Sequence, residues 1–325
     1  MWAVVLLMAL AWAGGARAGG DRRVITTLRH SAHRAAPRAA AAEPASAGQL
    51  PYLVSLKEKT YKVDNDTLWQ SVCGGVILAA RRVLAPAHCF EQNKFFFVRH
   101  PDYLRVVAGD PRAVALAPDA APAESSRARA ARRLHARRAQ WRRLAAVALH
   151  PHYHFPAHDL ALLDVDSPFV FNEWVDYIVA DRWAQDYRRC LAAGAGAAEA
   201  VGGEGASLVV ANVSVASRWR CSMLWEMNMN DFVCSESVVD GAALQAAGGP
   251  LVCEAGGAGG AGGAGGGELV LAGLLAGLAC DGSPLFTRLS AHADFIDEDS
   301  LDAAPPHPAT LQLLFALLVL LQIVQ

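Results

Sequence analysis

Two residues whose types carry out acid–base chemistry lie in distinct local settings. His88 precedes Cys89 in "VLAPAHCF", and Asp159 begins the run "DLALLDV". A histidine base that a buried carboxylate orients can activate a serine hydroxyl for attack on a carbonyl group. A third stretch, "LQAAGGPLVC" at 244–253, contains no hydroxyl group. A lone histidine or aspartate is more often structural, so any catalytic role depends on the flanking motifs.

The segments that would position these residues have the pattern of short β-strands. From Pro51 onward, runs such as "YLVSL", "GGVILAA", "YLRVVAG" and "SLVVANVSV" alternate with turns and show no helical period. Many short strands of this kind predict an all-β sandwich or barrel. The glycine-rich residues 255–267 predict a flexible loop that joins two strands. Residues 112–146, rich in alanine and arginine, predict either a helix or a loose segment.

Several segments, taken in order, give the sequence a specific resemblance. "VCGGVILAARRVLAPAHCF" contains His88, "HDLALLDVDSPF" contains Asp159, and "GGPLVC" ends at Cys253. Together with "PYLVSL", "HPHY", "CLAAGAG" and "PLFTRLSAHADFI", they resemble the chymotrypsin/trypsin-like (S1) serine proteases over residues 39–297. The resemblance implies an all-β fold of two six-stranded antiparallel β-barrels, with an Ala/Arg-rich insertion, a Gly-rich loop and the active site between the barrels.

The resemblance also implies how the seven cysteines pair. A fourth bridge of the family would end at Ala243, so Cys280 is expected to be unpaired. The three expected disulfides are Cys73–Cys89, Cys190–Cys253 and Cys221–Cys234.

The expected catalytic machinery is incomplete. His88 and Asp159 match the base and the orienting carboxylate, but Ala247 stands at the position of the nucleophile. Alanine has no group that attacks a carbonyl, so acyl-enzyme chemistry has no first step. Gln245 replaces a glycine whose N–H belongs to the oxyanion hole, and Ala246 replaces the carboxylate that receives the new N-terminus after activation.

Activation and substrate binding are also expected to be altered. Cleavage after Arg38 would create an N-terminus at Ala39 instead of isoleucine. Gly241, at the base of the specificity pocket, provides no charge for a substrate lysine or arginine. The family's Ser-Trp-Gly strand, which pairs with substrate, reads Leu275, Ala276 and Gly277, so a tryptophan wall of the cleft is lost.

The N-terminal region predicts export. The apolar run 2–13 and the following Ala-Arg-Ala predict a signal peptide over 1–18, with a buried first helix as the alternative. Residues 19–38 are polar and basic and predict a pro-segment. Disulfide-forming cysteines fit an oxidising compartment, where the sequons at Asn65 and Asn212 are candidate glycan sites.

Residues 127–143 carry eight arginines and no acidic residue. They predict a solvated loop, an anion-binding arm for heparin-like glycans, nucleic acid or anionic lipid, or a cleavage site for basic-site proteases. Only Trp141 could stack on a base, so we expect no sequence-specific binding of nucleic acid. The candidate anion-binding residues are Arg129, Arg132, Arg133, Arg137, Arg138, Arg142 and Arg143.

Residues 298–325 combine a polar spacer with a hydrophobic tail. The tail is shorter than the roughly 20 residues that span a membrane. Small residues, a spacer and an apolar tail favour a glycolipid (GPI) anchor signal with attachment at Asp302. A retained membrane-associated tail and a packed or disordered tail are the alternatives.

The sequence therefore predicts a secreted or cell-surface S1 homologue without catalytic activity. Its expected role is binding, as a cofactor or decoy that contacts extracellular proteases or their substrates. The alternatives are an active serine endopeptidase with an unrecognised nucleophile, and a structural surface protein. The net charge of −2 points to no partner by bulk electrostatics, and we predict no cofactor and no metal site.

Overall fold

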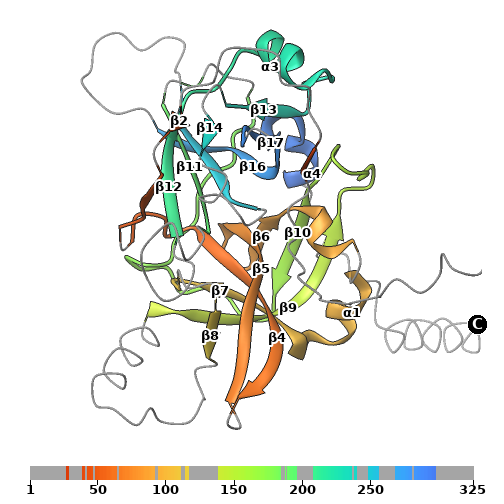
Figure 1. Cartoon of the computed structure of the whole chain (residues 1–325). Coiled ribbons are helices and arrows are strands. Elements are labelled where there is room, and N and C mark those ends of the chain that lie inside the picture. The colour runs from red at the N-terminus through yellow and green to blue at the C-terminus, as the bar shows by residue number, and fades with distance from the viewer. Residues whose placement is uncertain are drawn as a thin grey trace, which may run out of the picture.

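Two β-barrels make up the molecule (Figure 1). The first barrel is drawn in orange to yellow-green in the lower half of Figure 1, and the second, in green and blue, lies above it. The computed structural model describes residues 27–28, 39–40, 42–46, 48–63, 66–91, 94–110, 114–116, 138–183, 187, 189–195, 208–235, 238–239, 248–255, 268–279 and 282–297.

The first barrel is closed by hydrogen bonds around its whole circumference. Its strands follow the order β4-β7-β9-β10-β6-β5, and β5 pairs again with β4. A short strand, β8 (Val114–Leu116), pairs in antiparallel fashion with the first part of β5. The barrel strands are β4 (Leu53–Val63), β5 (Asp66–Ala79), β6 (Arg82–Ala85), β7 (Leu104–Ala108), β9 (Gln140–Leu149) and β10 (Ala161–Val165).

The second barrel has the strand order β13-β17-β16-β15-β11-β12. A bridge between Val215 and Ser235 brings its two outer strands together, and the amide of Ala216 donates to the carbonyl of Cys234 at 3.0 Å. These strands are β11 (Cys190–Ala195), β12 (Leu208–Val213), β13 (Phe232–Cys234), β15 (Pro250–Glu254), β16 (Leu269–Ala279) and β17 (Pro284–Arg288).

Short elements complete the fold. Strand β3 (Ala42–Pro44) pairs with β12, β1 (Thr27–Leu28) pairs with β16, and β2 (Ala39–Ala40) pairs with β14 (Val238–Val239). The helices are η1 (Ala87–Phe90), α1 (Lys94–Arg99), η2 (Pro101–Tyr103), α3 (Arg218–Trp225), η4 (Leu289–Ala291) and α4 (Ala293–Asp297).

One apolar cluster joins the two barrels. Leu84 and Leu162, on neighbouring strands of the first barrel, belong to the same buried cluster as Val252, Leu271 and Leu274 of the second. Burial of such side chains stabilises the contact by about 1.5–3 kcal/mol each. The cluster thereby holds the facing ends of the barrels in a fixed relation, as an active site between them requires.

The predicted all-β fold of two barrels is confirmed, and one detail of the prediction is wrong. Residues 140–146 lie in β9 and form neither a helix nor a loose segment. Trp141 pairs with Val107 of β7, and Leu144 is buried, so tertiary pairing outweighs the local arginine content. The glycine-rich stretch does join two strands, because β15 and β16 are antiparallel neighbours on either side of it.

Candidate active site

Two neighbouring strands of the first barrel bring His88 and Asp159 together. His88 lies in η1, directly after β6, and Asp159 lies just before β10. The strands pair in antiparallel fashion, with Ala85 opposite Ala161, so the end of β6 meets the start of β10. Residues 71 positions apart in the sequence thus become direct neighbours.

The carboxylate of Asp159 holds His88 through two hydrogen bonds. Oδ2 lies 2.6 Å from Nδ1 of His88, and Oδ1 accepts from the backbone N–H of the same residue at 2.8 Å. Asp159 is fully buried. A carboxylate at Nδ1 favours the tautomer with the proton there, which leaves the lone pair on Nε2. The pair therefore has the geometry of an oriented general base.

No hydroxyl group in the described part of the chain hydrogen-bonds to Nε2 of His88. The ring instead lies edge-on to Phe155, with centroids 5.7 Å apart and planes at 87°. Within the residues that the structure describes, His88 is a base without a hydroxyl to activate.

The second barrel contributes the segment that begins at Gly248. The amide of Gly248 donates to the carbonyl of Leu275 at 3.1 Å, and the amide of Leu275 donates to Gly249 at 2.8 Å. Gly248 has φ +86°, and a Cβ there would lie 2.2 Å from the carbonyl oxygen of Gly74 and 2.9 Å from Cδ of Pro86. Only glycine fits this close approach to the turn that carries His88.

The three expected disulfides are all present. Cys73–Cys89 connects β5 to η1, and its sulfurs lie within 4.8 Å of a ring nitrogen of His88. The other two bridges, Cys190–Cys253 and Cys221–Cys234, both lie in the second barrel and fasten β11 to β15 and α3 to β13.

A comparison with known families agrees with this geometry. A family model described as Trypsin matches residues 41–270. This chain belongs to the trypsin family. A curated relative in Rattus norvegicus, "Transmembrane protease serine 9", is 25% identical over 294 residues, which cover 83% of this chain. The trypsin-family chain spans only 23% of the length of that relative.

The trypsin-family chain continues past the matched region. Strand β17 and helices η4 and α4 follow residue 270 and pack into the molecule, where Leu289 and Phe295 are buried in the cluster between the barrels.

Among the described helices, none is long and apolar enough to cross a bilayer.

The structure places the predicted substrate-binding strand within β16. Leu275 and Ala276 are buried, and Leu275 packs into the core of the second barrel beside Phe286. The pairing of β16 with β17 shifts its register between Leu275 and Gly277. Leu275 therefore stabilises the barrel of this trypsin-family chain by burial of its side chain.

Several predicted site residues lie outside the described residues, so their predictions stay as they were made. They are Arg38, Asn65, Arg129, Arg132, Arg133, Arg137, Gly241, Gln245, Ala246, Ala247, Cys280 and Asp302. For Ala39 the structure gives the backbone pairing with Val238. Asn212, the second predicted glycan site, is exposed on β12.

The three described arginines of the predicted anion-binding set each have a partner inside the domain. The guanidinium of Arg138 stacks over the ring of Trp174 at 3.8 Å. Arg142 donates to the carbonyl of Pro168, and Arg143 pairs with Asp102 at 3.4 Å. These contacts stabilise β9 and its surroundings.

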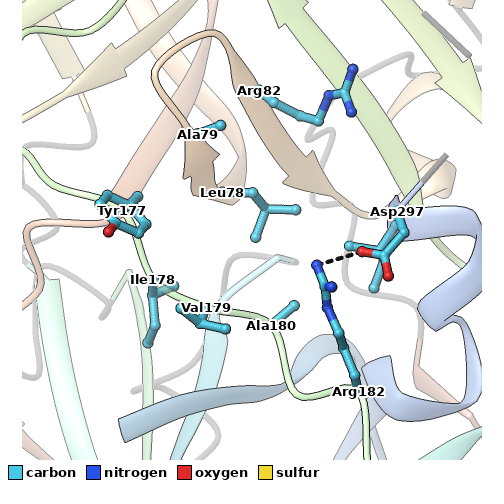
Figure 2. Close-up of a pocket in the computed structure, with 10 residues that line it drawn as sticks. Leu78, Ala79, Arg82, Tyr177, Ile178, Val179, Ala180, Arg182 and Asp297 are labelled. Atoms are coloured by element: carbon cyan, nitrogen blue, oxygen red, sulfur yellow. Dashed lines mark ion pairs between the residues drawn. The ribbon is translucent and has the colours of Figure 1, made fainter. Parts of the chain in front are cut away.

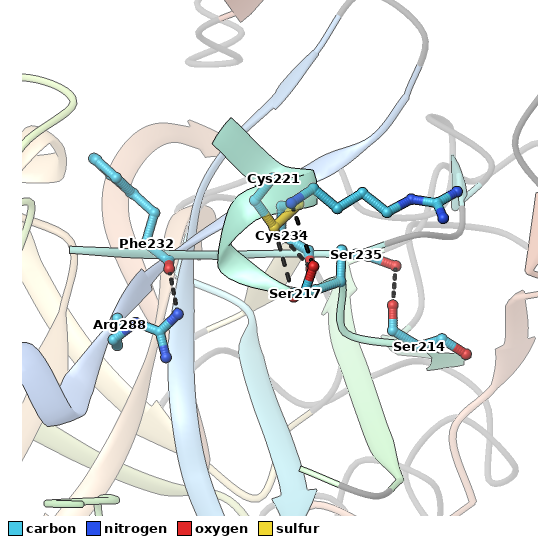
Figure 3. Close-up of a disulfide and its surroundings, with 9 residues drawn as sticks. Ser214, Ser217, Cys221, Phe232, Cys234, Ser235 and Arg288 are labelled. Carbon is cyan, nitrogen blue, oxygen red and sulfur yellow. Dashed lines mark hydrogen bonds between the residues drawn. A yellow bond between two sulfur atoms is a disulfide. The ribbon is translucent and has the colours of Figure 1, made fainter. Parts of the chain in front are cut away.

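The Cys221–Cys234 loop forms a compact unit (Figure 3). Ser217 caps α3 by accepting a hydrogen bond from the amide of Arg220 at 3.3 Å. The guanidinium of Arg288 on β17 donates to the carbonyl of Phe232 at 2.8 Å. The disulfide ties α3 to β13, the cap stabilises the start of α3, and the Arg288 hydrogen bond joins β17 to β13.

A pocket of about 500 Å³ lies between β5 and β6 of the first barrel, the segment that leads to β11, and helix α4 (Figure 2). Leu78, Ile178 and Ala180 form much of its apolar lining, and an ion pair between Arg182 and Asp297 lies at one side. Neither His88 nor Asp159 lines it. It is therefore separate from the candidate active site.

Sequence reasoning missed a cluster of histidines beside Asp159. His150, His158 and His292 each place a ring nitrogen within 4.8 Å of the others. Burial and the neighbouring histidines lower the pKa of His150 to about 4, and burial lowers the pKa of His292. The run "HPHYHFPAH" at 150–158 was the available signal, although it does not indicate His292.

Proposed function

We propose that this trypsin-family chain is non-catalytic and acts by binding, as a cofactor or decoy in extracellular proteolysis. One observation carries the proposal: Ala247, which directly precedes Gly248, occupies the place of the family's nucleophilic serine. His88 and Asp159 can hold a lone pair ready to take a proton, but a methyl group has no proton to give and no electron pair for attack. Gln245 and Ala246 remove further parts of the same machinery.

An exposed apolar surface supports a binding role. The segment between β10 and β11 exposes Trp183 at 73% and Val170 at 66%, and the rings of Phe171 and Tyr177 meet with centroids 5.4 Å apart. A contiguous apolar patch is typical of an interaction surface, and the Phe171–Tyr177 pair is a contact of this kind on the segment.

An active serine endopeptidase is the second candidate, and the intact hydrogen bonds between Asp159 and His88 are the observation that favours it. It requires a nucleophile other than residue 247. The wild-type protein, cleaved after Arg38, should hydrolyse no member of a peptide library that varies the residue before the scissile bond. Measurable hydrolysis that the substitution His88→Ala abolishes would establish the second candidate.

A second test restores the family's residues one step at a time and measures whether activity appears. Ala247→Ser should restore little activity, because the groups at 245 and 246 remain altered. Loss of one oxyanion-hole donor typically lowers kcat by about 10²–10³. The triple variant Gln245→Gly, Ala246→Asp, Ala247→Ser should therefore exceed the single variant by at least about 10²-fold in kcat/KM. His88→Ala in each background is the matched control. Full activity in Ala247→Ser alone would refute the roles given to the neighbouring positions.

The disulfides support an extracellular setting for this role, since such bonds persist in oxidising compartments. The signal peptide, glycans at Asn65 and Asn212 and a lipid anchor at Asp302 remain predictions. An anionic glycan or lipid partner likewise remains a prediction, for the arginines outside the described residues. Capture of partners from extracellular fluid on the immobilised protein separates a binding role from that of a structural surface protein.

A further inference from the structure

The histidine cluster next to Asp159 is assembled from three separate elements. His150 follows the last residue of β9, His158 directly precedes Asp159, and His292 follows η4 near the C-terminal helix. Nδ1 of His158 lies 3.1 Å from Nε2 of His292, and the rings of His150 and His158 stack with centroids 4.7 Å apart. Residues of the first barrel thus meet a residue that follows the last strand of the second.

The orientation of His292 is fixed by the backbone. Its Nδ1 lies 2.8 Å from the carbonyl oxygen of Arg288, and only a protonated nitrogen can hydrogen-bond there. Nε2 therefore carries the lone pair, and it faces His158. A carbonyl that binds the distal N–H of an imidazole is the usual arrangement behind a metal-ligating histidine.

We propose that His150, His158 and His292 bind a Zn²⁺ ion. Three imidazole nitrogens with a fourth position for water form a common zinc site. Zn–N bonds of about 2.0–2.1 Å in a tetrahedron place neighbouring nitrogens ~3.3 Å apart. The 3.1 Å between Nδ1 of His158 and Nε2 of His292 is close to that separation. The ring nitrogens of all three residues lie within 4.8 Å of one another, and the stacked ring of His150 would have to turn toward the other two to bind the same ion.

Two further histidines lie beside the cluster and could act as ligands. His152 and His154 are exposed, and their ring centroids lie 6.1 and 6.3 Å from that of His158. Either ring is near enough to complete the coordination in place of water. Nδ1 of His150 accepts a hydrogen bond of 3.2 Å from the amide of His152, so Nδ1 is the unprotonated nitrogen of the neutral ring. Zinc would take its lone pair in place of this hydrogen bond.

The backbone of His158 is strained in the free protein. Its φ of 54° lies in the left-handed region, where a non-glycine residue is disfavoured by roughly 1–2 kcal/mol. Asparagine tolerates this conformation better than most residues, so His158→Asn removes the ligand without disturbing the backbone. Strain of this kind at a side chain that meets two other histidines is typical of a functional position.

Bound zinc would connect the segment that carries Asp159 to the C-terminal end of the second barrel. It would cross-link the two barrels and stabilise the fold, whether or not the protein has catalytic activity. Its test therefore does not depend on the proposed function.

The experiment titrates the purified full chain, freed of metal by a chelator, with Zn²⁺ alone. We expect one bound ion per chain by calorimetry and a rise in Tm of at least about 5 °C at 100-fold excess over Kd. Co²⁺ in the same site should give the visible absorption of a four-coordinate ion with nitrogen ligands.

Variants decide where the ion binds. His158→Asn and His292→Gln should each lower the affinity for Zn²⁺ at least ~10-fold and reduce the Tm rise at the same zinc concentration by at least about half. His100→Asn, on an exposed histidine outside the cluster, should leave both unchanged. If a variant does not fold, the wild-type Co²⁺ spectrum still tests the site. The proposal is overturned if zinc does not raise Tm, if His158→Asn and His292→Gln bind as the wild type does, or if Co²⁺ gives only the spectrum of the hydrated ion.

Discussion

The two barrels contribute unequally to the candidate active site. The first barrel supplies a complete pair, with Asp159 buried and bonded twice to His88. The second barrel keeps Gly248, Gly249 and Cys253 of the nucleophile loop, but it has alanine at the position of the nucleophile (Ala247) and at that of the activation carboxylate (Ala246). The comparison separates residues that build the loop from residues that perform its chemistry.

The glycines of the loop are explained by packing alone. A Cβ on Gly249 would lie 2.0 Å from the carbonyl oxygen of Ala193, and one on Gly248 would meet Gly74 at 2.2 Å. These positions require glycine whether or not a serine stands before them. Their presence is therefore no evidence of activity. The motif "GGPLVC" is evidence for the fold, and it does not by itself indicate a reaction.

The largest effect should come from Gly249→Ala, which places a methyl group against backbone. Overpacking of a core typically costs about 1–3 kcal/mol, and a carbonyl in the β11 strand has less room to move than a side chain. We expect a loss of at least about 3 kcal/mol in the free energy of unfolding, measured by denaturant titration. Leu269→Ala, on an exposed residue of the same sheet, should change it by less than about 0.5 kcal/mol. Equal losses in the two variants would contradict the packing argument.

A smaller loss should follow Asp159→Ala, which leaves the buried amide and ring N–H of His88 without acceptors. Two hydrogen bonds to a charged group contribute about 3–6 kcal/mol together, but the variant also removes the cost of burying the carboxylate, so the expected net loss is about 2–3 kcal/mol, or several degrees in Tm. Asp159→Asn keeps one acceptor oxygen and should lose about half as much. Stability unchanged in Asp159→Ala would show that the pair has no structural role.

Cleavage after Arg38 should have the smallest effect. In the family, the new N-terminal amine pairs with a buried carboxylate, and Ala246 provides none. Tm and hydrogen exchange around the cleft should be nearly the same before and after cleavage. A rise of several degrees on cleavage would mean that another acidic group receives the amine.

Much of the first-barrel side of the site could be predicted from the sequence. The motifs around His88 and Asp159 fix the order of two neighbouring strands, and this order brings the residues together. The pairing of the three disulfides could also be predicted, because the family resemblance implies it. The start of β9 could not be predicted, because Arg142 and Arg143 interrupt the alternation of apolar and polar residues that is typical of a strand. Its register also depends on pairing with β7, which the local sequence does not show.

The histidine cluster shows a different limit. His150 and His158 lie close together in the sequence, but His292 is 134 residues beyond His158. Nothing in the local pattern around His292 indicates a ligand. Only the packing of the C-terminal elements against the first barrel brings the third ring to the other two.

The most direct test of the central claim is labelling with a fluorophosphonate probe, which reacts with the activated serine of serine hydrolases. The purified chain, before and after cleavage at Arg38, should remain unlabelled under conditions in which active trypsin is labelled completely. Labelling that reaches one probe per chain and disappears in His88→Ala would show that the protein has a working nucleophile, and it would contradict the account.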